Sequence, residues 1–210
     1  MGKEKIFCIS YQRTGTTSVS KFYRMNGYKV VDWSFDRKSW TEYFINGDYE
    51  KIFRSKEFRK FQVFEDHPWF LLDFYRVVYH RFPDAKFVHF VRDSNDWFES
   101  LKYLFDEVHS AKAFYWHYKA YGLLDEYYRM IETSRGNERP RLLIGNDQKE
   151  HFVKAYETAN RDITEFFKTH DKSRIIQLEL EDPDKWSKLA EFSNISNNKA
   201  VAVHENISNR

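Results

Sequence analysis

Cysteine, proline and glycine are scarce in this 210-residue chain, at one, four and seven residues, and long apolar runs are absent. The single cysteine, Cys8, excludes a disulfide within the chain, and its place in a short apolar segment predicts a buried, inert thiol. No stretch approaches membrane-spanning length, and the N-terminal residues do not have the pattern of a signal peptide. We therefore expect a cytoplasmic protein without a membrane partner.

The chain also lacks a charge excess of either sign. Its 34 basic and 32 acidic residues leave a formal net charge of +2, whereas a general nucleic-acid binder carries a larger basic excess. We therefore expect no nucleic-acid partner. Aromatic residues, in contrast, are abundant at 19%, and they predict a core rich in rings. The length suits a single domain over residues 1–210, in which the last ~15 residues are loosely held, as chain ends often are.

Short apolar segments alternate with segments of helical periodicity along most of the chain. This order predicts an α/β fold of three layers, α/β/α, in which helices cover both faces of a central parallel sheet. The expected strands are Lys5–Ser10, Tyr28–Val31, Phe61–Phe64, Lys86–Val91 and Arg174–Leu180. The expected helices are Thr16–Asn26, Pro68–Phe82, Asn95–Val108, Ser110–Ile131, Gln148–Lys168 and a short one containing Trp186, with short helices and loops over residues 33–60.

A polar turn with one glycine joins the first expected strand to the first expected helix. Gly15 lets the backbone approach a ligand closely, and the amides that follow it lie at a helix N-terminus, which suits a phosphate. Arg13 adds a positive charge. The turn differs from the Walker A pattern G-x-x-x-x-G-K-[ST], because Ser10 replaces the first glycine and Thr16 replaces the lysine. The loop alone therefore predicts phosphate binding but no reaction, and a threonine-capped turn without a ligand is the alternative.

Further polar residues stand directly after expected strands. The carboxyl ends of parallel strands meet at the same edge of a sheet, so we expect these side chains to converge on one crevice. The residues in question are Arg13, Asp32, Asp66, His67 and Arg92. Because the sequence shows no dedicated cluster of metal ligands, we expect no metal.

A second anion site is predicted after the strand Lys86–Val91. Arg92 follows that strand, and Ser100 lies about two turns into the next expected helix. The arginine supplies a charged donor fork and the serine a hydroxyl, so the pair could hold one anion. The alternative is an ion pair of Arg92 with Asp93 or Asp96, beside an ordinary surface Ser100.

The two predicted anion sites together resemble those of the sulfotransferase superfamily that uses 3′-phosphoadenosine 5′-phosphosulfate (PAPS), especially its bacterial-type group with an R-T-G-T-T loop. In that family the first loop binds the 5′-phosphosulfate, and the later arginine and serine bind the 3′-phosphate. The resemblance covers most of residues 5–193 and implies a P-loop NTPase-like sulfotransferase fold. It assigns donor binding to Arg13, Thr14, Gly15, Thr16, Thr17, Ser18, Arg92 and Ser100.

The chain also departs from the family pattern in two places. The tryptophan that many members carry after the two threonines is Ser18 here, so the adenine is expected to stack elsewhere. No R-K-G segment stands near the C-terminus, which leaves Arg135, Arg139 and Arg141 as candidates for a further grip on the 3′-phosphate.

The resemblance implies transfer of a sulfuryl group from PAPS to a hydroxyl or amine of a small-molecule or carbohydrate acceptor. Arg13 would stabilise the charge that grows on the leaving phosphate. His67 is the first candidate for the general base, because its position resembles that of the histidine in the K-T-H segment of cytosolic sulfotransferases. Asp66 and Asp32 are alternative bases, and a structural role at the helix expected from Pro68 is the alternative for His67.

Two other functions stay open at this point. A small-molecule kinase that uses ATP and Mg²⁺ would place Asp66 near the metal, although the P-loop lysine is missing at Thr16. A non-catalytic nucleotide-binding module on a sulfotransferase scaffold is the other alternative. The sequence predicts neither the acceptor nor the oligomeric state.

Overall fold

The computed structural model describes residues 4–32, 38–71, 73–107, 119, 123–133 and 146–196. Contacts between Cα atoms divide the chain into two compact units. Unit 1 comprises residues 1–92 and 167–207, and unit 2 comprises residues 93–166 and 208–210. The expectation of a single domain stays a prediction.

Unit 1 contains a five-stranded sheet in the order β2-β3-β1-β4-β5, in which all neighbouring strands are parallel. Ile6 of the central strand pairs with Val63 on one side and with Lys86 on the other. The strands are β1 (Ile6–Cys8), β2 (Val30–Val31), β3 (Val63–Phe64), β4 (Lys86–Val91) and β5 (Ile175–Glu179). Every expected strand is therefore present, and the parallel sheet with flanking helices is confirmed.

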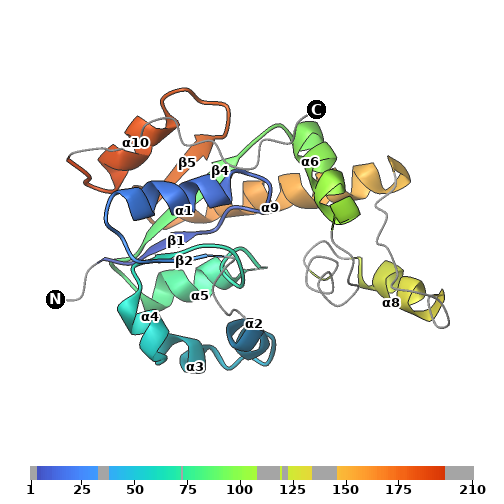
Figure 1. The fold of residues 1–210 in the computed structure, drawn as a ribbon, viewed down its shortest axis with the longest axis horizontal. Helices are drawn as coiled ribbons and strands as arrows, with labels where there is room; N and C mark the ends of the chain where they lie inside the picture. Colours follow the sequence, from blue (N-terminus) through green and yellow to red (C-terminus); the bar gives the residue numbers. More distant parts are fainter. Residues whose placement is uncertain are drawn as a thin grey trace. The chain divides into compact units, whose positions relative to one another are not determined.

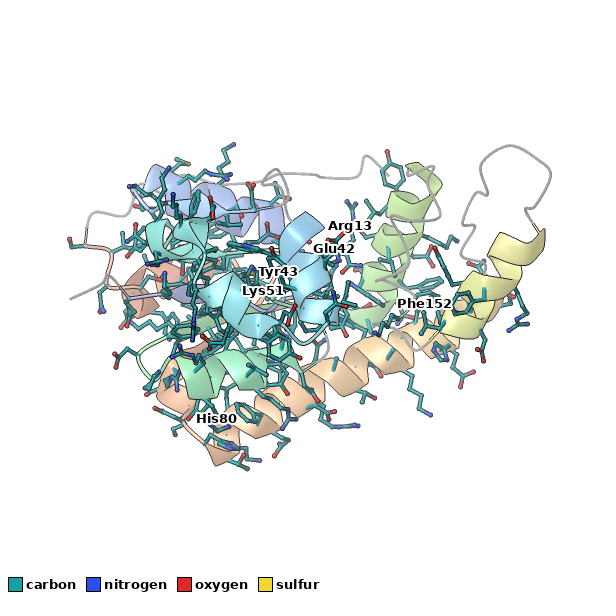
Figure 2. All side chains as sticks on the ribbon, turned by 90° about the horizontal axis from the view of Figure 1, so that it is seen from below. Arg13, Glu42, Tyr43, Lys51, His80 and Phe152 are labelled. Atoms are coloured by element: carbon teal, nitrogen blue, oxygen red, sulfur yellow. The ribbon has the colours of Figure 1, made fainter. Side chains whose placement is uncertain are left out.

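The helices of unit 1 are mostly short, as residues 33–60 led us to expect. They are α1 (Thr16–Met25), α2 (Lys38–Ile45), α3 (Tyr49–Phe53), α4 (Lys56–Lys60), α5 (Phe74–Arg81), the 3-10 turn η2 (Lys172–Arg174) and α10 (Lys185–Phe192). In α3, the Lys51 ammonium lies 5.4 Å from the centre of the Tyr43 ring of α2, and Figure 2 labels both residues.

The expectation of a helix from Pro68 is wrong, because α5 begins only at Phe74. Before it the chain makes tight turns, in which the Trp69 amide donates to the Asp66 carbonyl at 2.9 Å and the Leu71 amide to the Pro68 carbonyl at 3.0 Å. The apolar residues of this segment pack inward from turns, and their spacing resembles a helical repeat only by coincidence. Trp69, for example, is 1% exposed.

Different helices cover the two faces of the sheet, and Figure 1 shows α1 and α10 on one side and α5 on the other. Successive residues of a strand point to opposite faces, so Ile6 and Cys8 of β1 face α1 and α10. The core on this face is a cluster of buried residues: Ile6, Cys8, Val19, Phe22, Tyr23, Val30, Val63, Val88, Phe90, Leu178, Trp186, Leu189 and Ala190.

The opposite face of the sheet is built from aromatic rings. Phe7, the middle residue of β1, lies 5.0 Å from Phe64 and 5.0 Å from Trp69 between ring centres, and 5.9 Å from Phe87. Phe167, at the end of the long helix α9 (Lys149–Thr169), lies 4.9 Å from Phe87. Such ring pairs stabilise a core beyond the area they bury, and the expected ring-rich core is confirmed.

Unit 2 contains α6 (Ser94–Glu107), α8 (Leu124–Thr133), the 3-10 turn η1 (Asn146–Gln148) and most of α9. Asp93 caps α6, because its carboxylate accepts from the amides of Asn95 and Asp96 at 2.9 and 3.0 Å. The rings of Trp97 and Tyr156 stack at 4.2 Å and join α6 to α9.

Some expectations concern residues that the structure does not describe. Of the helix expected over Ser110–Ile131, the structure describes residue 119 and the segment from residue 123, and residues after 196 lie outside the described part. Among the described residues, no helix is both long and apolar enough to cross a membrane.

Arg174, just before β5, binds the end of α5 and the turn after it. Its Nε donates to the Ala85 carbonyl at 3.0 Å, and Nη2 donates to the Phe82 carbonyl at 2.7 Å. Both terminal nitrogens lie 3.3 Å from the Tyr79 carbonyl, and the guanidinium lies 3.9 Å from the Tyr79 ring centre. The side chain thus adds a charged donor to the Tyr79 carbonyl in the last turn of α5 and to the carbonyls of Phe82 and Ala85 in the turn that follows.

We predict that Arg174→Met lowers the free energy of unfolding by about 2–3 kcal/mol, because three carbonyls lose a charged donor. Urea unfolding followed by tryptophan fluorescence measures the change. The matched control is Arg161→Met, which removes an exposed guanidinium whose ion pair with Asp162 is 3.5 Å long, and it should cost less than about 0.5 kcal/mol. Equal effects of the two changes would contradict the prediction.

Candidate functional site

The loop between β1 and α1 is held to the sheet by Ser10. The Ser10 hydroxyl accepts from the Phe90 amide of β4 at 2.7 Å and lies 3.4 Å from the Val88 carbonyl. This explains why a serine stands where a Walker A loop has glycine: its side chain joins two strands at the start of the loop. Further along, the Thr14 hydroxyl, fully buried, donates to the Tyr11 carbonyl at 2.6 Å and closes the turn.

Gly15 begins α1 in a left-handed conformation, with φ 84° and ψ 18°, which glycine adopts without the penalty that a Cβ brings. The first helical hydrogen bond runs from the Val19 amide to the Gly15 carbonyl at 3.1 Å. Gly15 contributes no side-chain cap, and the first turn of α1 contains no acidic residue. The positive end of α1 is therefore suited to an anion.

Arg92 follows β4 and contacts the same loop. Its Nη1 donates to the backbone carbonyl of Arg13 at 3.3 Å, and its Nε lies 3.8 Å from the Glu181 carboxylate. Arg13 itself has a φ of 68°, and Figure 2 labels it on the loop that follows β1. Two arginines from separate parts of the sequence thus meet at one loop.

Asp32 follows β2 and is buried against α1. Its carboxylate forms an ion pair with Arg24 of α1 at 2.5 Å, and the side chain is 4% exposed. The pair joins the end of β2 to α1, so a structural role accounts for this carboxylate.

Asp66 and His67 form a hydrogen-bonded pair after β3. The Asp66 carboxylate lies 2.9 Å from Nδ1 of His67 and also accepts from the His67 backbone amide at 2.9 Å. The imidazole packs edge-on against Phe70 at 4.9 Å, and Phe70 packs against Tyr11 at 5.6 Å. A carboxylate on one ring nitrogen fixes the orientation of an imidazole, and Nε2 of His67 is buried.

Glu65 was not among the candidate site residues predicted from the sequence. It is 2% exposed and accepts a hydrogen bond from Ser20 of α1 at 3.3 Å, and the Thr16 hydroxyl also forms a hydrogen bond with it. Burial, together with the charges of Asp66 and Asp32, raises the pKa of Glu65 to about 8. The available signal was a carboxylate directly after a buried strand, but the sequence does not show that α1 presents two hydroxyls to it.

The five polar residues expected at the strand ends all lie at one edge of the sheet, because the strands that precede them are parallel. Those residues are Arg13, Asp32, Asp66, His67 and Arg92. Their binding and catalytic roles stay predictions, as do those of the half-buried Thr17 and the buried Ser18.

Ser100 lies in unit 2, on α6, and its side chain is buried there at 8% exposure. Its pairing with Arg92 stays a prediction. Arg135, Arg139 and Arg141 lie outside the described residues. The described ranges contain no group of three or more His, Cys, Asp or Glu side chains arranged to hold a metal ion.

Comparison with known proteins gives one family. Residues 5–202 match the family model Sulfotransfer_4, which describes a sulfotransferase domain. A search of curated proteins finds no match.

We predict that Gly15→Ala destabilises unit 1 more than Gly47→Ala does. Both glycines have positive φ, at 84° and 74°, so both substitutions strain the backbone, by about 1 kcal/mol or more. Only at Gly15 does the added Cβ meet another group, Leu180 Cδ1 at 2.6 Å, whereas nothing lies within 4 Å at Gly47. Thermal unfolding compares the two variants, and equal losses would show that Leu180 yields without cost.

Proposed function

Because the chain belongs to the Sulfotransfer_4 family of sulfotransferase domains, we propose that it transfers a sulfuryl group from PAPS to an acceptor hydroxyl or amine. The acceptor oxygen or nitrogen attacks the sulfur, and the bond from sulfur to the bridging oxygen of the 5′-phosphate breaks. Adenosine 3′,5′-bisphosphate leaves with the bond electrons, and the acceptor gives up one proton. The acceptor belongs to the small-molecule or carbohydrate class.

The observation that carries the proposal is the loop from Arg13 to Gly15 at the end of β1. Arg13 stands two residues before Gly15, which begins α1, and both follow the end of β1. Negative charge grows on the bridging oxygen as the bond to sulfur breaks. Fixed donors at that position stabilise the transition state more than the ground state, and this difference lowers the barrier.

Arg92 supports a second phosphate site beside the first. Its guanidinium reaches the loop through the Arg13 carbonyl at 3.3 Å, which uses part of its donor fork. The planar guanidinium of an arginine presents five N–H donors in a fork that matches a phosphate. We assign Arg92 to the 3′-phosphate of the donor, and a role of Ser100 there stays the prediction made from the sequence.

His67 is the general base in this proposal, and Asp66 orients it. The 2.9 Å contact of Nδ1 with Asp66 places the proton of the neutral ring on Nδ1, so Nε2 accepts the acceptor's proton. The resulting imidazolium then lies next to a carboxylate. Asp32 is a weaker candidate, because its carboxylate is engaged by Arg24 at 2.5 Å.

We predict that Arg92→Ala lowers the affinity for adenosine 3′,5′-bisphosphate about tenfold to hundredfold, as expected for lost charged hydrogen bonds. The affinity for adenosine 5′-monophosphate, which lacks the 3′-phosphate, should change far less. Arg13→Ala should weaken both nucleotides alike, because both carry the 5′-phosphate. Isothermal titration calorimetry without magnesium measures all four affinities.

The control is Arg54→Ala, which removes a guanidinium that is 79% exposed on the surface after α3 and should leave both affinities unchanged. If Arg92→Ala weakened both nucleotides equally, the contact with the Arg13 carbonyl would be its whole role. Tighter binding of ATP with magnesium than of adenosine 3′,5′-bisphosphate would favour a kinase over the proposed reaction.

We also predict that His67→Gln lowers kcat about a hundredfold or more while the affinity for adenosine 3′,5′-bisphosphate stays within about twofold, because general-base catalysis contributes to the chemical step alone. Asp66→Asn should lower kcat to a smaller extent. The measurement is turnover of labelled PAPS, with an acceptor first found in a panel of alcohols, phenols, sugars and amines.

His80→Gln provides the matched control, since His80 lies exposed on α5 (Figure 2) and should keep the kcat of the parent chain. A fully active His67→Gln variant would exclude His67 as the base. Loss of turnover in Asp32→Asn, without loss of stability, would assign that role to Asp32.

A further inference from the structure

Glu65 is a buried carboxyl that the proposed transfer reaction does not use. It lies between the end of β3 and α1, where Ser20 donates to it at 3.3 Å and the Thr16 hydroxyl forms a second hydrogen bond. Thr16 and Ser20 are four residues apart, so they share one face of the helix. One carboxyl thus connects the first and second turns of α1 to the sheet.

We propose that Glu65 is a positioning residue for donor binding: its neutral form holds the start of α1 in place, and its ionisation weakens binding of the donor's phosphate. This inference rests on the proposed function, because it takes the start of α1 as the donor site.

The surroundings of Glu65 favour the neutral form. The titratable groups that face it are Asp66 on the same strand end, Asp32 at the end of β2, and Cys8 on β1. Arg24 forms its ion pair with Asp32, whereas the partners of Glu65 among the described side chains are the two hydroxyls. Burial is the largest cause of the raised pKa of about 8, and the charges of Asp66 and Asp32 add to it.

Ionisation would place a negative charge beside the first turn of α1. That turn carries the positive end of the helix dipole, and the donor's phosphate depends on the same dipole. An ionised Glu65 therefore competes with the phosphate for the helix end and repels it through a medium of low dielectric. The hydroxyls of Thr16 and Ser20 favour the charged form, so they set the pH at which this change occurs.

The same proton also links Glu65 to stability. Its folded-state pKa lies above the ordinary value of 4.5, so the folded chain holds the proton more tightly than the unfolded chain. The stabilisation is complete below about pH 4.5 and is lost as the pH rises through about 8. A merely structural Glu65 would show this effect on stability but no effect on the pH dependence of donor affinity.

The test is the affinity of the full chain for adenosine 3′,5′-bisphosphate between about pH 7 and about pH 9, a range in which phosphate groups keep their charge. If only the neutral form binds well, the fraction of neutral Glu65 predicts a fall of about tenfold over this range. Glu65→Gln, which stays neutral, should abolish the fall. Ser20→Ala removes a hydrogen bond that favours the charged form of Glu65. In this variant the fall in nucleotide affinity should therefore occur at higher pH.

The matched control is Glu57→Gln on α4, where the parent side chain is exposed, and this variant should keep the parent pH profile. Ser20→Ala is a separate test should Glu65→Gln not fold, which circular dichroism shows. Thermal unfolding of the variants at the same pH values follows the stability effect independently of the nucleotide.

The outcomes separate this inference from the proposed function. The inference is supported if the affinity of Glu65→Gln does not change with pH and the fall in affinity of Ser20→Ala occurs at higher pH than in the parent chain. The inference is overturned if the affinity of Glu65→Gln falls with pH as much as that of the parent chain, or if the affinity of the parent chain does not change with pH. The proposed function stands in either case. If the parent chain fails to bind adenosine 3′,5′-bisphosphate at any pH, the proposed function falls, and the inference falls with it.

Discussion

The parallel pairing of β1 with both of its neighbours is the constraint on which the site depends. Ile6 pairs with Val63 of β3 and with Lys86 of β4. Because both pairings are parallel, the C-terminal ends of all three strands lie at the same edge of the sheet. Ile6, Phe7 and Cys8 are each at most 1% exposed. Ile6 and Cys8 pack into a mixed aliphatic and aromatic cluster on one face, and Phe7 packs among rings on the other. A shift by one residue would exchange these two cores, so packing determines the register.

The sheet was predictable because most residues of β1, β2, β3 and β4 are buried on both faces. Such strands appear in a sequence as short continuous apolar runs between polar turns, and β4 was expected with the bounds it has, Lys86–Val91. The start of α5 was not predictable in the same way. Phe70 and Leu71 have the spacing of a helix, yet they lie in the turns that end at Phe74. Apolar spacing indicates burial, and an inward-facing turn produces the same spacing as a helix.

The site was predictable to the extent that topology decides it. The polar residues after each strand predicted that Arg13 and Arg92 lie at one edge of the sheet, because parallel strands bring such positions together. This pattern could not identify partners, which depend on how α1 is rotated against the sheet. The contact of Glu65 with Ser20 joins residues 45 positions apart. No local pattern reports such a contact, so Glu65 looked like one more polar residue after a strand.

Three carboxyl groups follow strands at the edge of the sheet where α1 begins. They pose an electrostatic problem for any anion that binds there, and each is compensated in a different way. Asp32 faces a guanidinium, that of Arg24. Asp66 accepts hydrogen bonds from the backbone and the ring of His67. Glu65 has hydroxyl partners, and burial raises its pKa to about 8. Mild alkali leaves the charges of an ion pair unchanged, but it removes the proton from a buried neutral carboxyl. As the pH rises, Glu65 is therefore the first of the three carboxyl groups whose charge changes. The carboxyl that forms a hydrogen bond with Thr16, in the first turn of α1, is thus also the one whose charge depends most on pH.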